Sequence, residues 1–270
     1  MKRIFEVDGA AIACAEEGDG DAFVLVHGAG ANRNYWRALA TQLVARGRRA
    51  LAPDLYGHGE TAPWPRAAER PYSYLDDVAV LERLTAELPE PFVLVGHSSG
   101  GAVSLEFAAR HPERVRKLVV LEPMLPTVLD GVDDAAFAEV AGAYRQAHDA
   151  VAAGDDERAA RLLFEYILGS DEWQRLPSAT RAWMVAHADC TLCAHSRASL
   201  ALRPEGSRYE RIRCPVLLLH GEHTRAPYRR ICEVVARRLP DVRATAIVGA
   251  AHNGPLTHTR EFHRLLFSFC

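Results

Sequence analysis

The chain has little lysine and no strong excess of either charge. Only Lys2 and Lys117 are lysines, arginine supplies the other 30 of its 32 basic residues, and the formal net charge over 270 residues is −3. Such a balance offers no electrostatic basis for binding nucleic acid or an anionic membrane surface. We therefore expect a small-molecule substrate, no nucleic-acid or membrane partner, and a monomer or homodimer.

The sequence also has no long apolar segment, and its first residues do not predict a secretory leader. No run of apolar residues approaches the length that spans a membrane, and Glu6 interrupts the N-terminus before a hydrophobic region can form. For a chain of this size without a leader, free thiols in a reducing compartment are the expected state. Six cysteines are scattered along it, at Cys14, Cys190, Cys193, Cys214, Cys232 and Cys270. We predict a cytoplasmic protein.

What the sequence does contain is an alternation of strands and helices. Asp8-Gly9 predicts the turn of a hairpin between the first two strands. From residue 23 onward the strands are largely apolar and helical segments separate them, which indicates a parallel sheet covered on both faces. Segments typical of strands lie at residues 3–7, 10–16, 23–26, 50–52, 91–95, 115–121, 216–219 and 244–248. The predicted fold class is α/β, with a mostly parallel central sheet of about eight strands flanked by helices.

One interval breaks this alternation. Between residues 124 and 209 only helical patterns occur, at 135–153, 156–168 and 178–202. An all-helical insertion between two core strands is typical of a cap over the carboxyl ends of the sheet, where ligands bind in open α/β folds. We therefore predict a core of residues 1–123 and 210–270, and a helical cap of residues 124–209.

The most informative motif is Gly96-His97-Ser98-Ser99-Gly100, because an apolar strand leads into it and a helix leads out of it. In a G-x-S-x-G sequence the serine lies on a sharp strand-to-helix turn and projects above the sheet edge. The glycines are needed because this turn leaves no room for Cβ atoms. The backbone N–H of Ser99 then points toward negative charge that develops on a substrate oxygen. The motif predicts a serine nucleophile at Ser98.

Five motifs occur along the chain in an order that resembles the α/β-hydrolase superfamily over nearly its full length. Each motif alone is weak, whereas five in order are specific for the superfamily, though not for one enzyme within it. With a serine at position 98, the chain resembles the branch of the superfamily that uses a serine nucleophile. The motifs are His27-Gly28-Ala29-Gly30, the segment 53–59, the segment 96–100, the segment 217–222 and Gly249-Ala250-Ala251-His252.

This resemblance implies a role for four residues. Ser98 is expected to be the nucleophile and His252 its general base, with an oxyanion hole made by the backbone N–H groups of Ala29 and Ser99. A serine hydroxyl attacks well only when a histidine takes its proton, and that histidine needs a carboxylate to hold its tautomer and orientation. The serine also disfavours dehalogenase and epoxide hydrolase chemistry, because those enzymes of this fold use an aspartate nucleophile.

The acid that such a site needs is missing from its usual position. There, two residues after Glu222, the chain has Thr224, which cannot carry the charge that stabilises an imidazolium. Glu122 stands at the end of the strand 117–121, where some members of the superfamily place their acid, and we favour it. Glu222 is the second candidate, although its side chain is expected to point differently. A site without a triad acid is the third alternative.

The expected function is a serine hydrolase that cleaves a small or medium carboxylic ester, thioester or lactone through an acyl-enzyme. No cofactor and no metal is expected. The spacing of His187, Cys190, Cys193 and His195 is close to that of a zinc site, but it falls in a helical pattern and no second ligand pair lies elsewhere. A lyase, cyclase or acyl-transfer enzyme on the same fold and a non-catalytic ligand-binding protein are the alternatives, because fold alone does not settle function.

Overall fold

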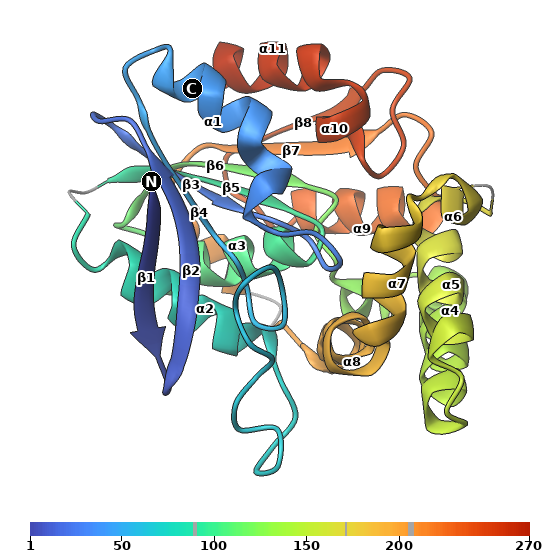
Figure 1. Cartoon of the computed structure of the whole chain (residues 1–270). Coiled ribbons are helices and arrows are strands. Elements are labelled where there is room, and N and C mark those ends of the chain that lie inside the picture. The colour runs from blue at the N-terminus through green and yellow to red at the C-terminus, as the bar shows by residue number, and fades with distance from the viewer. Residues whose placement is uncertain (89–90, 171, 205–207) are drawn as a thin grey trace.

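An eight-stranded sheet runs through the centre of the computed structural model, which describes residues 1–88, 91–170, 172–204 and 208–270 (Figure 1). Its strands lie in the order β1-β2-β4-β3-β5-β6-β7-β8. β2 runs antiparallel to both of its neighbours, and all other neighbouring strands are parallel, which confirms the predicted fold class. The strand bounds are Lys2–Val7, Ala10–Glu17, Ala22–Val26, Arg49–Pro53, Phe92–His97, Val115–Leu121, Val216–Gly221 and Val242–Ile247.

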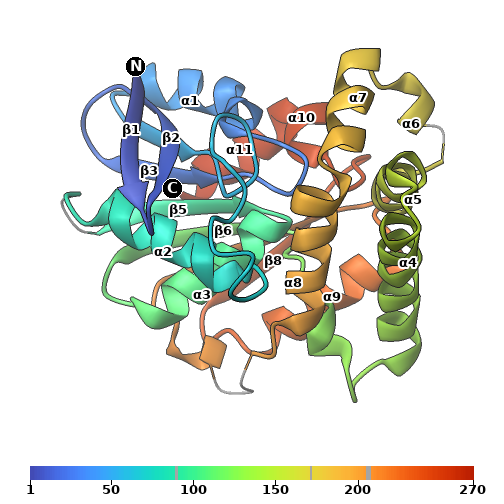
Figure 2. The ribbon, with the colours of Figure 1, turned by 60° about the horizontal axis from the view of Figure 1, so that its bottom comes forward.

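Helices cover both faces of this sheet (Figure 1, Figure 2). α2, α3 and α9 pack on one face, and α1 and α11 pack on the other. In β5, Leu94 joins the first of these two hydrophobic clusters, whereas Val93 and Val95 join the second. Because both faces are buried, this strand is apolar at successive positions. The bounds are α1 Arg37–Val44, α2 Tyr74–Thr85, α3 Ser99–Arg110, α9 Ala226–Ala236, α10 Gly254–Thr257 and α11 Thr259–Phe269, with a 3-10 turn at Arg33–Trp36.

The hairpin between β1 and β2 turns where the sequence predicts it. Asp8 and Gly9 have φ values of 49° and 79°, the left-handed conformation that a two-residue turn between antiparallel strands requires. The strands pair from Val7 opposite Ala10 outward. Only glycine, and to a lesser degree aspartate and asparagine, adopt this conformation at little cost, so the dipeptide sets the register of the hairpin.

Between β6 and β7 the described residues form helices and turns but no strand. The single helix predicted over 178–202 is wrong, because a π-helical segment interrupts it between α7 and α8. None of the described helices is both long and apolar enough to cross a membrane. The division into a core and a cap of residues 124–209 stays a prediction. The helical bounds are α4 Asp134–Ala152, α5 Asp156–Leu168, α6 Glu172–Arg175, α7 Ser178–Ala186, the π-helical segment Ala188–Cys193 and α8 Ala194–Ala201, with 3-10 turns at Pro126–Leu129 and Arg208–Arg211.

Polar contacts join this helical segment to the loops of the sheet. The Thr191 hydroxyl donates to the carbonyl of Gly57 at 2.9 Å. His195 in α8 lies 3.3 Å from the Tyr72 hydroxyl through its Nδ1, and Tyr72 in turn donates to the carboxylate of Asp77 in α2. The segment is therefore attached to the core at the loop before α2 as well as through its two chain connections.

Asp77 is fully buried in this arrangement, and its protonation is coupled to folding. Burial raises the pKa of Asp77 from 3.8 to about 7, against hydrogen bonds from the Tyr72 hydroxyl and the Tyr56 N–H that lower it. The folded protein therefore keeps this proton to a higher pH than the unfolded chain does. The contribution of Asp77 to the free energy of unfolding is consequently greatest at low pH and falls as the pH rises from about 4 to about 7.

We expect Asp77→Asn to lose this dependence, because asparagine does not titrate. The free energy of unfolding of Asp77→Asn relative to wild type should rise between pH 5 and pH 7 by about 1.4 kcal/mol per pH unit at its steepest. Urea unfolding at pH 5, 6, 7 and 8 measures it, with the exposed Asp149→Asn as the matched control. A difference between Asp77→Asn and wild type that stays constant with pH would contradict this account.

Candidate active site

Ser98 lies on a strained turn between β5 and α3. Its φ of 56° and ψ of −122° are sparsely populated for a residue with a side chain, and its neighbours hold it there. The Ser98 N–H donates to the carbonyl of Leu121 at 2.9 Å, and the Ser98 carbonyl accepts from the Met124 N–H at 3.0 Å and the Ala102 N–H at 3.1 Å. The conformation directs the side chain away from the sheet, and the hydroxyl lines a cavity.

The glycines around Ser98 are required by close backbone contacts, as the motif predicts. A Cβ at Gly100 would overlap the carbonyl oxygen of His27, and a Cβ at Gly96 would overlap the Ser104 side chain and the Gly100 carbonyl. At Gly28 a Cβ would lie 2.9 Å from the Ser98 Cβ. The loop after β3 can therefore approach the turn closely because these positions lack side chains.

Glu122 follows β6 directly and is 3% exposed. Its backbone also adopts a positive φ, 40°, which turns the side chain toward the loops that follow β7 and β8. The carboxylate accepts three hydrogen bonds. Oε1 accepts from the Gly221 N–H at 2.7 Å, and Oε2 accepts from the Thr224 hydroxyl at 2.7 Å and from Nδ1 of His252 at 2.6 Å.

These partners keep Glu122 ionised inside the protein. Burial alone would raise the pKa of the carboxyl group. The charge and hydrogen bond of His252, together with the Gly221 N–H and the Thr224 hydroxyl, outweigh burial and lower the pKa below its ordinary value. The site therefore holds a negative charge against the ring of His252 at neutral pH.

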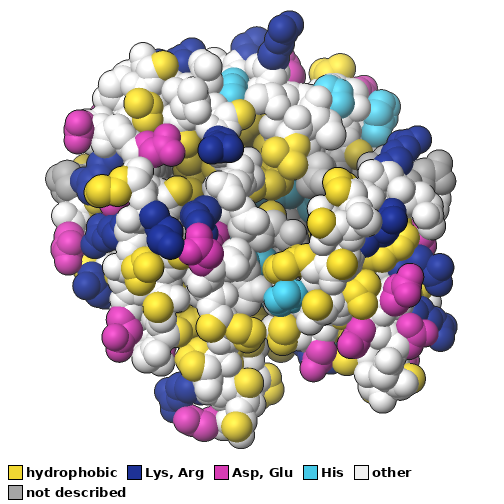
Figure 3. All heavy atoms as spheres, viewed as in Figure 1, with side chains coloured by type: hydrophobic (Ala, Val, Ile, Leu, Met, Phe, Trp, Pro, Cys, Tyr) yellow, Lys and Arg dark blue, Asp and Glu magenta, His cyan; other side chains and the backbone are white. Residues whose placement is uncertain are grey.

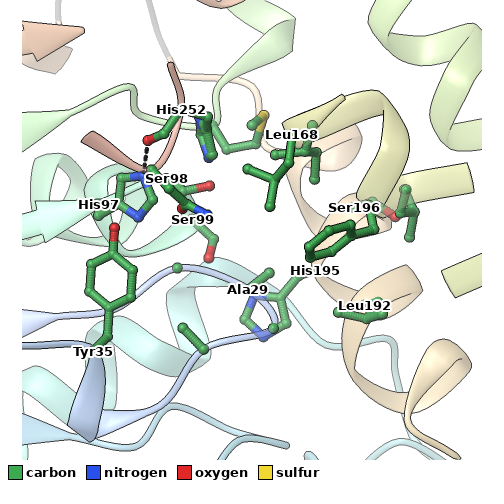
Figure 4. A pocket seen from close by; sticks show the side chains of 18 of the residues that line it. Ala29, Tyr35, His97, Ser98, Ser99, Leu168, Leu192, His195, Ser196 and His252 are labelled. Carbon is green, nitrogen blue, oxygen red and sulfur yellow. Dashed lines mark hydrogen bonds between the residues drawn. The ribbon is translucent and has the colours of Figure 1, made fainter. Parts of the chain in front are cut away.

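His252 lies on the loop after β8 and is 5% exposed. Its backbone carbonyl accepts a hydrogen bond from Nε2 of His97 at 2.9 Å, which fixes this loop against the end of β5. With Nδ1 directed to Glu122, the other edge of the ring is directed toward Ser98 (Figure 4). Among the described residues no hydrogen bond joins His252 to Ser98. Such bonds between nucleophile and base commonly tighten only when substrate binds.

The loop Gly28-Ala29-Gly30 faces Ser98 from the other side of the cavity. Gly30 has a φ of 76°, and its N–H donates to Nε2 of His58 at 3.1 Å. The Ala29 N–H has no hydrogen-bond partner in the described part of the chain. The N–H of Ser99, at the first position of α3, has no acceptor within its own helix, as holds for any helix N-terminus. These two groups are free to bind a substrate oxygen.

Two buried histidines support that loop as neutral rings. His58 donates from Nδ1 to the carbonyl of Tyr56 and accepts from Gly30 through Nε2. His27 donates from Nδ1 to the Gly28 carbonyl and accepts from the Leu55 N–H through Nε2. Burial lowers the pKa of both rings, that of His58 well below 6.5, with the neighbouring His195 adding to the effect. The hydrogen bonds assign the Nδ1–H tautomer to each ring.

Comparison with known proteins identifies the family of this chain. The model of the alpha/beta hydrolase fold family matches residues 21–259. The chain belongs to the alpha/beta hydrolase fold family.

Relatives within the family differ in the substrates that they are named for. The chain is 26% identical over 249 residues to a pimeloyl-[acyl-carrier protein] methyl ester esterase of Chromobacterium violaceum, covering 92% of this chain and 94% of that protein. It is 37% identical over 112 residues to a 2-hydroxymuconate semialdehyde hydrolase of Pseudomonas sp. strain CF600, covering 39% and 38% of the two chains.

Solved structures of this fold match along the whole chain. An esterase from Exiguobacterium antarcticum superimposes with a TM-score of 0.77 at 22% identity, covering 100% of this chain and 99% of the esterase. The alpha/beta hydrolase MGS-M2 from a deep-sea metagenome library superimposes with a TM-score of 0.79 at 17% identity, covering 99% and 96%. At this identity the likeness establishes the fold alone.

In this alpha/beta hydrolase, Glu222 lies away from His252. Its side chain is exposed, and Oε2 accepts a hydrogen bond from the Gly249 N–H at 2.8 Å. Glu222 thus fixes the loop before His252 from the outside, whereas Glu122 contacts the ring itself. The role of Thr224 was not anticipated from the sequence. Its hydroxyl donates to the Glu122 carboxylate at 2.7 Å.

The cavity above Ser98 has a volume of about 180 Å³ and lies between the sheet and the helical segment (Figure 3, Figure 4). Ser98, Ser99, Ala29 and His252 all line it. None of the described residues that line it is aspartate, glutamate, lysine or arginine. Its outer wall is apolar and comes from α5, α7 and the π-helical segment, through Leu163, Phe164, Ile167, Leu168, Met184 and Leu192.

Residues 187–195, whose spacing is close to that of a zinc site, make packing contacts within the helical segment. Cys193 is buried, and His187 donates from Nδ1 to the Trp183 carbonyl at 2.7 Å while stacking on that ring. Within the described residues, no group of three or more histidine, cysteine, aspartate or glutamate side chains is arranged to hold a metal ion.

Proposed function

We propose that this alpha/beta hydrolase cleaves a small or medium carboxylic ester, thioester or lactone through an acyl-enzyme on Ser98. The observation that carries the proposal is the 2.6 Å hydrogen bond between His252 Nδ1 and Glu122, made beside a serine on a strained turn in one cavity. We assign Ser98 as nucleophile, His252 as general base, Glu122 as triad acid, and the N–H groups of Ala29 and Ser99 as the oxyanion hole.

Acylation begins with attack of Ser98 Oγ on the substrate carbonyl carbon. As the new C–O bond forms, His252 Nε2 takes the hydroxyl proton, and the π electrons of the carbonyl move onto its oxygen. The N–H groups of Ala29 and Ser99 stabilise that oxyanion. When the tetrahedral intermediate collapses, the bond to the leaving group breaks, and His252 gives the proton to the departing alkoxide or thiolate.

Deacylation repeats these steps with water. His252 takes a proton from water as its oxygen attacks the acyl carbon, and Ser98 Oγ then leaves with that proton. In both halves the imidazolium forms against the Glu122 carboxylate, whose lowered pKa keeps it charged. Glu122 itself takes no proton in this scheme.

The relatives support ester cleavage. The Chromobacterium protein, which aligns over almost the whole of both chains, is named as a methyl ester esterase. The cavity supports an uncharged, largely hydrocarbon substrate, because its described lining is free of charged side chains and its outer wall is apolar. A cytoplasmic location and a monomeric or dimeric state stay predictions from the sequence.

The proposed nucleophile can be tested by labelling. A fluorophosphonate should modify Ser98, as read by peptide mass spectrometry, because this hydroxyl lies on the strained turn beside His252 and the proposed oxyanion hole. Ser98→Ala should lower kcat on a p-nitrophenyl ester by a factor on the order of 10⁵. Labelling at another serine, or undiminished turnover by Ser98→Ala, would overturn the proposal. Labelling of Ser98 without hydrolysis of any ester would favour lyase or acyl-transfer chemistry.

The acid assignment predicts that two glutamates behave differently. Glu122→Gln should lower kcat by about 10³- to 10⁴-fold, because glutamine cannot hold the His252 tautomer or stabilise the imidazolium. Glu222→Gln is the matched control and should stay within about twofold, since its amide oxygen can still accept from Gly249 and it does not touch the ring. Steady-state kinetics on one ester measures both, and equal effects would reject Glu122 as the acid.

A second variant makes the acid test sharper. The Thr224 hydroxyl lies 2.7 Å from the Glu122 oxygen that binds His252, so an aspartate at position 224 can reach the same ring nitrogen. Glu122→Gln/Thr224→Asp should therefore recover about tenfold or more of the activity lost in Glu122→Gln. Failure of the double variant with an intact fold would indicate that the carboxylate acts elsewhere.

The cavity predicts a preference among esters. From p-nitrophenyl acetate upward, kcat/KM should rise by about fourfold per methylene until the apolar space is filled, and then fall. A free carboxylate at the far end of the acyl chain should lower kcat/KM by about 100-fold relative to its methyl ester, because no described cation lines the cavity to pair with it. Equal rates for the acid and its methyl ester would contradict an uncharged substrate.

A further inference from the structure

Three buried polar atoms beside the nucleophile have no hydrogen-bond partner within the described part of the chain. They are the Tyr35 hydroxyl, Nδ1 of His97 and Oγ of Ser99. All three residues line the cavity above Ser98. A buried polar atom without a partner is destabilising unless something else binds it, so these atoms indicate where a ligand contributes hydrogen-bonding groups.

Two of the three atoms have a simpler explanation. His97 donates through Nε2 to the His252 carbonyl, and burial lowers its pKa to about 3, so its Nδ1 is a bare acceptor. It therefore offers no proton to a substrate oxygen. The Tyr35 ring stacks on that imidazole at 5.2 Å between ring centroids, which accounts for its position by packing. Ser99 has no such contact for its hydroxyl.

The Ser99 side chain lies at the cavity wall, next to the proposed nucleophile. Ser99 is the first residue of α3 and is 1% exposed, so its side chain has little freedom. In Figure 4 this side chain lies beside Ser98 and points toward Ala29. The hydroxyl therefore lies next to the two residues whose N–H groups form the proposed oxyanion hole.

We propose that Ser99 is a catalytic residue that supplies two hydrogen bonds to the reacting carbonyl oxygen, one from its backbone N–H and one from its side-chain hydroxyl. This inference rests on the proposed function. No proton is transferred: Ser99 Oγ–H donates to the oxygen as the π electrons of the carbonyl move onto it. The bond strengthens as negative charge develops, so the hydroxyl stabilises the transition state more than the bound substrate.

Ser99→Ala tests this directly, because alanine keeps the backbone N–H and removes only the hydroxyl. We expect kcat to fall by about 10- to 100-fold with KM within about twofold. The affinity for a trifluoromethyl ketone, which forms a tetrahedral oxyanion on Ser98, should weaken by the same factor. Ser99→Thr retains the hydroxyl and should recover most of the loss in both measurements.

A merely structural role for Ser99 would give a different pattern. Thr85→Ala is the matched control, since Thr85 is buried in α2 and donates to the Leu81 carbonyl far from the cavity. It should lower thermal stability without changing kcat or inhibitor affinity. If Ser99→Ala keeps both kcat and inhibitor affinity while Ser98→Ala is inactive, the third donor is rejected and the hydrolase proposal stands. If Ser98→Ala retains turnover, the hydrolase proposal itself fails.

Discussion

The hydrogen bond between Glu122 and His252 is the contact on which the rest of the site depends. It joins the end of β6 to the loop after β8 and spans the end of β7, which contributes the Gly221 N–H to the same carboxylate. Breaking it would leave a buried carboxylate with fewer partners and a ring with no fixed tautomer. The carboxylate of Glu122 therefore contacts both the end of β7 and the loop that carries His252.

Neutral rings position the loop on the opposite wall of the cavity. The loop Gly28-Ala29-Gly30 is positioned by the neutral rings of His27 and His58, and burial keeps those rings unprotonated. In the proposed mechanism these two walls have separate tasks: the Glu122–His252 pair serves the proton transfer, and neutral N–H groups bind the substrate oxygen.

Much of this was predictable from the sequence because backbone requirements leave local signatures. The Asp8-Gly9 turn and the glycines around Ser98 follow from φ values and close contacts that few residues tolerate. Glu122 was favoured from its place at a strand end. The contact of Glu122 with His252 could not be read from the sequence, because it depends on the positive φ at Glu122 and on the position of the loop after β8.

Other features depend on tertiary contacts that no local pattern encodes. The break in the helix predicted over 178–202 coincides with Thr191, whose hydroxyl binds the Gly57 carbonyl far away in the chain. In the sequence, Thr224 stands where an acid is expected, and only the fold shows that its hydroxyl donates to Glu122. The unpaired hydroxyl of Ser99 is likewise visible only when its surroundings are known.

The protonation of the His252 ring tests the central claim most directly. In protein labelled with ¹⁵N-histidine, heteronuclear NMR near neutral pH should show the proton of this ring on Nδ1 and a bare Nε2, with that preference lost in Glu122→Gln. A His252 ring that carries its proton on Nε2 in the wild-type protein, or whose tautomer is unchanged in Glu122→Gln, would contradict the account.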